Sequence, residues 1–446
     1  MLIASIRNKI KKHYRHGRRF EQHYNYFQRL SQTPIPELQS SQEKELKKLI
    51  EFCYKNIPYY REQFDARNIN YREINTLNDL KQLPIIDKHT IKKHWQAFNK
   101  KNFLSLLNKE AYTSGTTGTP VKFLRDYNAI NFENAAIWHY WHQAGDHNYR
   151  RMTLRGEMLK PVSQSNPPFW TYNGENNELV MSSYHLSAKN IDHYMHQMQA
   201  FQPDVLYCYP STGALLAKLL QEKGFHYSFQ SIFTSSEMLN PAELELMETT
   251  FGCQVFDWYG QAERVASIFK CASGHYHINE SYSIVELVPA ANHTPHNQRL
   301  YEIIGTHLNN YAMPLLRYRT HDLIELAENE GPCSCGSPFR MVKKVIGRKP
   351  SYIVTPEGDL IGNAPANILK GIKEITEAQF YQDNKHSLQI KIIPSKNYSA
   401  HTKKLLTTRV KDYVSPQLEV DILEVDFIER GPNGKFVALI SSLSEE

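Results

Sequence analysis

Long apolar runs are absent from this 446-residue sequence, in which no stretch of about 18 uncharged apolar residues occurs. The absence excludes a transmembrane helix of the usual length. The N-terminus also lacks the apolar segment of a secretory signal. We therefore expect a cytoplasmic protein without a transmembrane segment.

A strong excess of one charge is also missing. The formal net charge is +6, with 52 basic residues against 46 acidic ones spread along the chain, which argues against a nucleic-acid-binding surface. The most basic segment is Asn8 to Arg19, NKIKKHYRHGRR. Such charge runs are usually solvated helix faces, but this one also allows contact with an anionic lipid surface or a partner. The oligomeric state stays open.

Cysteine is scarce, with six residues in the chain, which excludes a disulfide-rich secreted scaffold. Two of them form the close pair Cys333 and Cys335. In a reducing compartment this spacing favours metal ligation over a disulfide.

The apolar content of 41% is enough for one large core and a second, smaller one. Apolar spacing predicts a helix over Ser41 to Tyr60, within a mostly helical segment 1–110. The strand-like segments Asp204 to Tyr209 and Ser231 to Thr234 flank the helix-like Thr212 to Lys223. This alternation predicts an α/β layered fold.

Strand-like sequence follows Asn279 and includes Tyr311 to Tyr318. After the polar break at residues 347–350, two alternating strands, Ser387 to Ile393 and Val420 to Phe427, surround a helical Thr402 to Val414. This pattern predicts a compact α+β module. We expect a large domain over residues 1–347 and a small domain over residues 348–446.

The strongest motif is Tyr112 to Pro120, YTSGTTGTP, with Lys122 just beyond it. Glycines allow close approach to a phosphate, and hydroxyl and amide groups can donate hydrogen bonds to its oxygens. It is not a Walker A loop, because Thr119 and not Lys follows Gly118. An ordinary polar turn is the alternative.

This loop resembles the phosphate loop of the adenylate-forming superfamily of acyl- and aryl-CoA ligases. The sequence looks most like the phenylacetate-CoA ligase branch, including capsular-polysaccharide-associated relatives. The resemblance implies a large multi-layered domain followed by a small mobile α+β domain, with ATP and magnesium as cofactors. The residues that it assigns to the nucleotide in this loop are Thr113, Ser114, Gly115, Thr116, Thr117, Gly118 and Lys122.

A second segment, Phe256 to Glu263, resembles the aromatic-Gly-x-Thr-Glu motif of the same enzymes, in which the acidic residue ligates magnesium. Glu263 inherits that role, and Ala262 stands where the family has Thr. The upstream segment Thr234 to Glu237 resembles a loop that helps to hold the adenine. The nucleotide-binding residues implied here are Ser235, Ser236, Glu237, Asp257, Trp258, Tyr259 and Gly260.

Three further positions complete the resemblance. Asp322, in YRTHD, is implied to bind the ribose hydroxyls, and Arg348, in the interdomain hinge, to contact the nucleotide. Lys435, near the C-terminus, is implied to be the catalytic lysine. Pro350 and Ser351 replace two acidic hinge residues, so the pivot is not identified.

The cysteine pair also has a counterpart in some phenylacetate-CoA ligase relatives, which carry a metal cluster in a similar place. That resemblance implies a structural zinc site formed by Cys271, His277, Cys333 and Cys335. Three thiolates and one imidazole are a common closed zinc set. His275 is an alternative to His277, and buried free cysteines are the alternative to any metal site.

The resemblance implies activation of a carboxylic acid, aryl acids included, as acyl-AMP, followed by transfer to a thiol, with CoA as the expected acceptor. A carrier-protein thiol or a sugar or other amine acceptor in polysaccharide or lipid biosynthesis is the first alternative. A nucleotide-binding scaffold without catalysis is the second, because of the changes at Ala262, Pro350 and Ser351.

Overall fold

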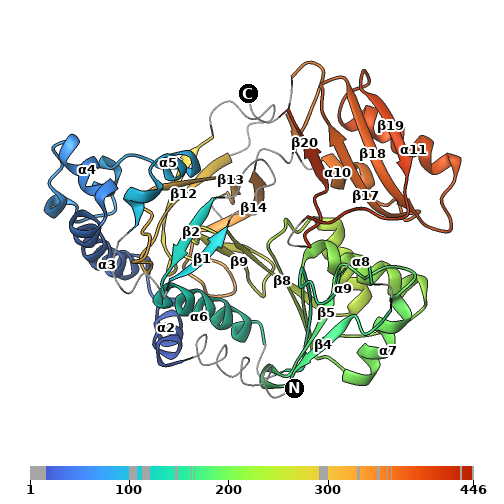
Figure 1. Cartoon of the computed structure of the whole chain (residues 1–446), viewed down its shortest axis with the longest axis horizontal. Helices are drawn as coiled ribbons and strands as arrows, with labels where there is room; N and C mark the ends of the chain where they lie inside the picture. Colours follow the sequence, from blue (N-terminus) through green and yellow to red (C-terminus); the bar gives the residue numbers. More distant parts are fainter. Residues whose placement is uncertain are drawn as a thin grey trace. The chain divides into compact units, whose positions relative to one another are not determined.

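The computed structural model divides the chain into two compact units (Figure 1). The first unit comprises residues 1–147 and 258–345, and the second comprises residues 148–257 and 346–446. The predicted boundary at residue 348 remains a prediction. The residues that the structure describes are 17–99, 108–112, 121–145, 149–161, 163–164, 166–290, 300–328, 332–348, 352–358, 360–362, 364–431 and 434–443.

The described N-terminal part of the first unit is mostly helical, as predicted. Its α-helices are α2 (Arg18–Leu30), α3 (Ile35–Asn56), α4 (Pro58–Ala66) and α5 (Lys88–Lys93), followed by α6 (Tyr127–Gln143). The expectation of one helix through Tyr60 was wrong, because Ile57 is extended (φ −112°, ψ 108°) between α3 and α4. Pro58 disfavours helical backbone in the residue before it and lacks an N–H to donate.

An antiparallel sheet forms the rest of the first unit. Its strands lie in the order β11-β12-β13-β14-β10-β9, with the end of β8 beside β9. Residues 311–317, expected to be strand-like, form no strand, and β13 begins at Tyr318. A separate hairpin joins β1 (Lys109–Tyr112) to β2 (Lys122–Arg125). The sheet strands are β8 (Gln254–Gly260), β9 (Ser267–Lys270), β10 (Tyr276–Ile278), β11 (Ile284–Pro289), β12 (Leu300–Thr306), β13 (Tyr318–Leu326) and β14 (Met341–Arg348).

The second unit begins with a mainly parallel sheet. Strands β7, β6, β3 and β5 are neighbours in that order and run parallel, and β4 closes the edge antiparallel to β5. Helix α8 follows β6, and α9 follows β7, which is the predicted alternation. The elements are β3 (Arg151–Arg155), β4 (Trp170–Asn173), β5 (Glu178–Ser182), α7 (Ile191–Phe201), β6 (Val205–Cys208), α8 (Pro210–Glu222), β7 (Ser231–Ser235) and α9 (Pro241–Phe251).

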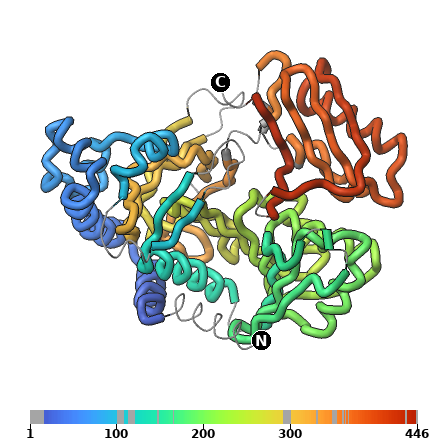
Figure 2. The backbone as a smooth tube through the Cα atoms, viewed as in Figure 1, coloured from blue at the N-terminus to red at the C-terminus, as the bar shows by residue number. Residues whose placement is uncertain are grey.

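The C-terminal part of the second unit has its own apolar core. Its four strands lie side by side in the order β19-β18-β17-β20 (Figure 2), and α10 contacts α11. The predicted α+β module is therefore present. Its elements are β15 (Tyr352–Val354), β16 (Leu360–Gly362), α10 (Ala364–Leu369), β17 (Ile375–Gln382), β18 (Ser387–Pro394), α11 (Ala400–Tyr413), β19 (Glu419–Glu424) and β20 (Leu439–Ser441).

The predicted α/β class is confirmed. Within the described residues, every helix is too short or too polar to cross a membrane.

Candidate active site and metal centre

The predicted phosphate loop lies mostly outside the described residues, since Thr113 to Pro120 are not among them. Its flanks are the paired strands β1 and β2. Lys122 forms an ion pair with Glu110, and its ammonium lies 5.7 Å from the centre of the Trp95 ring. The hydrogen bond to Glu110 raises the pKa of Lys122. Lys122 is thus held next to the predicted loop.

Glu263, the predicted magnesium ligand, is a buried carboxylate with 4% of its surface exposed. Its Oε1 accepts a hydrogen bond from the Tyr318 hydroxyl at 3.0 Å. Carboxylate oxygens are the ligands that magnesium prefers. The side chain is therefore chemically suited to the predicted role and is held by a partner on β13.

His307 fixes the backbone beside this carboxylate. Its Nε2 lies 2.6 Å from the Glu263 carbonyl oxygen, and its Nδ1 accepts from the Leu315 N–H at 3.2 Å. Burial lowers the pKa of His307 to about 4. At neutral pH the imidazole is therefore uncharged and donates its Nε2–H to Glu263. No sequence motif indicated this residue.

Asp322, the predicted ribose ligand, lies on the same strand as Tyr318. The Tyr259 hydroxyl donates to Asp322 Oδ2 at 2.7 Å, and the Asp322 N–H donates to Thr320 Oγ1 at 3.0 Å. Tyr318 and Asp322 both belong to β13 and are both buried. Strand β13 therefore contacts both Glu263, through Tyr318, and Tyr259, through Asp322.

The other predicted residues of the aromatic segment surround Tyr259. The buried Trp258 ring packs on Tyr140 at 5.6 Å between centres. A Cβ at Gly260, the last residue of β8, would lie 3.1 Å from Trp258 Nε1, a tight contact that the indole would have to relieve. Asp257 accepts from Thr234 Oγ1 at 2.7 Å, which ties the middle of β8 to β7.

Ser235 is the last residue of β7 in the second unit, and Ser236 follows it. Ser236 has a positive φ of 73°, and its Oγ accepts from Arg155 Nη2 at 2.7 Å. Ser235 is buried, and its Oγ lies 3.4 Å from that of Ser236. Sequence reasoning missed Arg155, which no motif marks.

Glu237, expected to help to hold the adenine, makes two backbone contacts. Its Oε2 accepts from the Ser211 N–H at 3.1 Å, and its Oε1 accepts from the Phe436 N–H at 2.8 Å. Burial raises the pKa of Glu237. The carboxyl group therefore links the start of α8 to the residue after Lys435, and its nucleotide role remains a prediction.

The segment that carries Lys435 is held by several further contacts within the second unit. Arg430 pairs with Glu377 and lies 4.7 Å from the centre of the Phe436 ring. Gly434 has a φ of 68°, and a Cβ there would lie 2.4 Å from the Gly156 Cα. The half-buried Lys435 is thus carried on a fixed segment. Arg348, the predicted hinge residue, is the last residue of β14.

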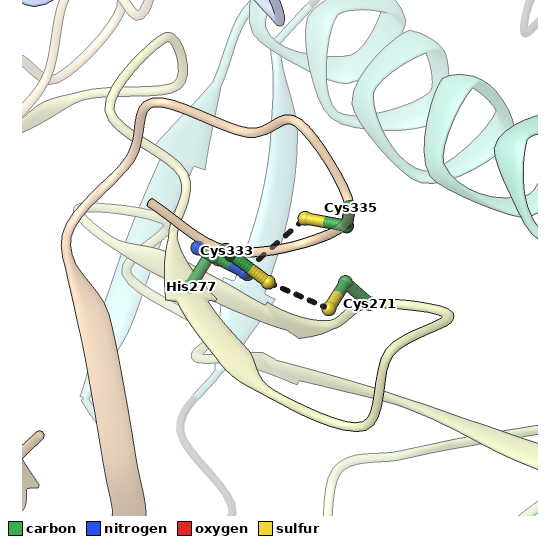
Figure 3. A group of neighbouring side chains, drawn as sticks. All are labelled: Cys271, His277, Cys333 and Cys335. Carbon is green, nitrogen blue, oxygen red and sulfur yellow. Dashed lines mark hydrogen bonds between the residues drawn. The ribbon is translucent and has the colours of Figure 1, made fainter. Parts of the chain in front are cut away.

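The four predicted zinc ligands come together in the first unit (Figure 3). One ligand atom from each of Cys271, His277, Cys333 and Cys335 lies within 4.8 Å of the others. Cys271 Sγ is 3.8 Å from Cys333 Sγ, and His277 Nε2 is 3.5 Å from Cys335 Sγ. This set of donors fits a tetrahedral zinc ion, and we keep zinc as a proposal.

The two candidate histidines differ in their surroundings. His277 is buried on β10, and its Nδ1 lies 3.1 Å from the Phe339 carbonyl oxygen, which leaves Nε2 toward the cysteines. Metal-bound histidines usually have such a second partner. His275 is exposed, and its Nδ1 lies 3.4 Å from Cys333 Sγ. The geometry therefore favours His277.

Comparison with known proteins gives both sequence and fold relatives. The model of the CapK C-terminal domain matches residues 353–442. Protein CapK of Staphylococcus aureus is 26% identical over 88% of this chain and 86% of its own length. Phenylacetate-coenzyme A ligase of Thermus thermophilus is 21% identical over 92% of this chain and 98% of its own length.

Among solved structures, 2-hydroxyisobutyryl-CoA ligase in the postadenylation state has the same fold. The TM-score is 0.71 at 15% identity, over 93% of this chain and 91% of that one. The resemblance found in the motifs is thereby confirmed, and the chain is a relative of CapK and of the phenylacetate-CoA ligases, with the fold of adenylate-forming enzymes.

Proposed function

We propose that this protein is an AMP-forming carboxylate ligase, which activates an acid as acyl-AMP and passes the acyl group to a thiol. The observation that carries the proposal is the arrangement on β13. Tyr318 of this strand donates to Glu263, the carboxylate assigned to magnesium. Asp322 of the same strand, assigned to the ribose, accepts from Tyr259. The relation to CoA ligases supports the same activity.

In the proposed first step a substrate carboxylate oxygen attacks the α-phosphorus of ATP, and the bond to pyrophosphate breaks. Lys435 supplies positive charge for the phosphate oxygens, where charge develops in the transition state. Glu263 would hold magnesium, which neutralises phosphate charge when bound. The zinc site would hold its loops together and has no open position for chemistry.

In the proposed second step the thiol of an acceptor attacks the acyl carbon, and AMP leaves. We propose CoA as the acceptor because the phenylacetate-coenzyme A ligases are relatives. The first experiment is ATP–pyrophosphate exchange over a panel of aryl, fatty and hydroxy acids with Lys435→Ala. We expect acid-dependent exchange in the native protein and a loss of roughly 100-fold or more in the variant.

The exposed Lys403→Ala, on α11, is the matched control and should exchange normally. ATP binding is measured in parallel. Binding of ATP without exchange for any acid would contradict the proposed ligase and favour a non-catalytic nucleotide-binding scaffold.

A second proposal concerns the acceptor. The motif resemblance to capsular-polysaccharide-associated relatives leaves a carrier-protein thiol, or a sugar or other amine in polysaccharide or lipid assembly, as the alternative to CoA. Product analysis with CoA present or omitted separates the two. An acyl-CoA product supports CoA, whereas acyl-AMP that persists in the presence of CoA supports another acceptor.

A further inference from the structure

Three neighbouring parallel strands of the second unit, β3, β6 and β7, end at the same edge of the sheet. Ligands of open α/β sheets bind outside this carboxyl edge. Arg155 is the last residue of β3, Tyr207 lies near the end of β6, and Ser236 follows β7. The topology therefore places a cation, an aromatic ring and a hydroxyl at a ligand-binding position.

The guanidinium of Arg155 is held on several sides. Its central carbon lies 4.5 Å from the ring centre of Tyr207 and 4.8 Å from that of Tyr209. Nη2 donates to Ser236 Oγ at 2.7 Å, and Nη1 donates to the Tyr207 hydroxyl. The Ser183 hydroxyl donates to the Arg155 carbonyl oxygen at 2.8 Å, which also fixes the backbone.

Arg155 forms no ion pair with an acidic residue among the described residues, unlike two other arginines of this unit. Arg150 pairs with Asp204, and Arg430 pairs with Glu377. The Arg155 Nε is buried and has no hydrogen-bond acceptor within the described part of the chain. The residue as a whole is half-buried and its Nη2 side is exposed, so an anion can reach the guanidinium there and form a partly desolvated ion pair.

The position of Arg155 relative to the lysine-bearing segment connects it with the acyl group. Gly156 follows Arg155 in the chain, and its Cα is so close to Gly434 that a Cβ on Gly434 would clash with it. Gly434 directly precedes Lys435. The Arg155 side chain also contacts Ser236, the neighbour of Glu237, whose carboxylate accepts from the Phe436 N–H just after Lys435. The predicted phosphate loop belongs to a different part of the chain, residues 113–120.

We propose that Arg155 is a specificity-determining residue and selects carboxylic acids that carry a second anionic group, either a carboxylate or a phosphate. This inference rests on the proposed ligase activity. Two hydrogen bonds occupy two of the five N–H groups of the guanidinium, so donors remain for a bidentate contact with an anion. The tyrosine rings keep its plane in one orientation, which reduces the entropy lost on binding.

The test compares each dicarboxylic acid with its monomethyl ester, which has nearly the same shape but one charge fewer. Pyrophosphate-exchange kcat/KM is measured for aliphatic and aryl pairs, and for phosphate-bearing hydroxy acids with their unphosphorylated forms. We expect the native protein to prefer the doubly anionic member by about tenfold to a hundredfold. The series with the larger preference in kcat/KM, dicarboxylic or phosphate-bearing, identifies the second anionic group.

Arg155→Met should remove this preference by lowering kcat/KM for the doubly anionic acid alone, and Arg155→Lys should keep part of it. The exposed Lys189→Met, in the same unit, is the control and should leave the preference unchanged. An equal loss for both members of a pair, or a native preference for the monoesters, would overturn the proposal, because Arg155 would then serve the fold or the nucleotide.

Calorimetric binding of the same pairs keeps the two proposals separate. A native protein that exchanges no acid but binds diacids more tightly than monoesters, with the difference lost in Arg155→Met, would contradict the ligase and retain the anion site. Exchange with acids that lack a second charge, together with equal binding of both pair members, would retain the ligase and refute the anion site.

Discussion

Two titratable side chains, Glu243 and His307, have pKa values that burial moves in opposite directions. The pKa of Glu243 is raised to about 8 by burial and by the neighbouring Glu237, whereas that of His307 is lowered to about 4. The stabilisation from neutral His307 is therefore lost as the pH falls from 6.5 toward 4. For Glu243 the loss occurs as the pH rises.

Glu243→Gln tests this second effect. The native carboxyl stays protonated up to about pH 8, whereas the unfolded group loses its proton near pH 4.5, so native stability falls as the pH rises through this window. An amide cannot ionise. We expect the free energy of unfolding of the variant, relative to that of the native protein, to increase by at most about 1.4 kcal/mol per pH unit between pH 5 and pH 8.

Urea unfolding at several pH values measures the difference. Glu245→Gln, at an exposed position of the same helix α9, is the control and should follow the native profile. Parallel profiles for the Glu243 variant and the native protein would show that Glu243 is ionised in the fold.

Single-residue contacts were the least predictable part of the site. Asp322 and Glu263 stand in recognisable motifs, so the sequence alone was enough to single them out. Arg155 stands in TLRGEM, which matches no motif, and His307 is 44 positions from the carbonyl that it binds. Their importance depends on which strands are neighbours, and local residue patterns do not contain that information.

At the scale of elements, the metal cluster joins the β9–β10 hairpin to the turn that carries Cys333 and Cys335. The Cys-x-Cys-Gly turn indicated a metal site, and the family resemblance supplied the other two ligands. The choice between His275 and His277 was not predictable, because both stand in the same short segment and only the fold decides which one is buried. Likewise, α3 and α4 were predicted as one helix, because apolar spacing continues across the break at Pro58.

Metal analysis tests the cluster. We expect about one equivalent of zinc in protein purified without chelator, and loss of the metal with a lower Tm in Cys335→Ser and His277→Ala. His275→Ala should retain the metal, because its ring is exposed and His277 supplies the imidazole. Cys253→Ser, in the second unit, is the control. Metal loss in His275→Ala with retention in His277→Ala would reverse the assignment.

At the scale of the whole molecule, the two compact units are each built from segments that are distant in sequence. Composition indicated only the break near Arg348. It did not predict that residues 346–446 group with residues 148–257, because that grouping depends on contacts such as Lys218 Nζ with the Thr376 carbonyl oxygen at 2.9 Å. Long-range contacts of this kind leave no periodic pattern in the sequence.

Gly434→Ala tests whether the contacts of the lysine-bearing segment serve only one half-reaction. The new methyl group would lie 2.4 Å from the Gly156 Cα, a backbone atom that cannot move aside cheaply, so the segment should shift and weaken the Phe436 N–H bond to Glu237. Under the proposed mechanism Lys435 acts in adenylation. We therefore expect pyrophosphate exchange to fall by roughly tenfold or more, while thioester formation from supplied acyl-AMP and CoA changes little.

The control for backbone strain is Gly371→Ala. Gly371 has a similar φ of 73° in the same module, but a Cβ there meets nothing within 4 Å. Both variants carry the cost of a left-handed alanine, about 1 kcal/mol, so a difference between them isolates the contacts of the new methyl group, chiefly with Gly156. Equal loss of both half-reactions in Gly434→Ala would indicate a folding defect, and unchanged exchange would mean that adenylation does not require this contact.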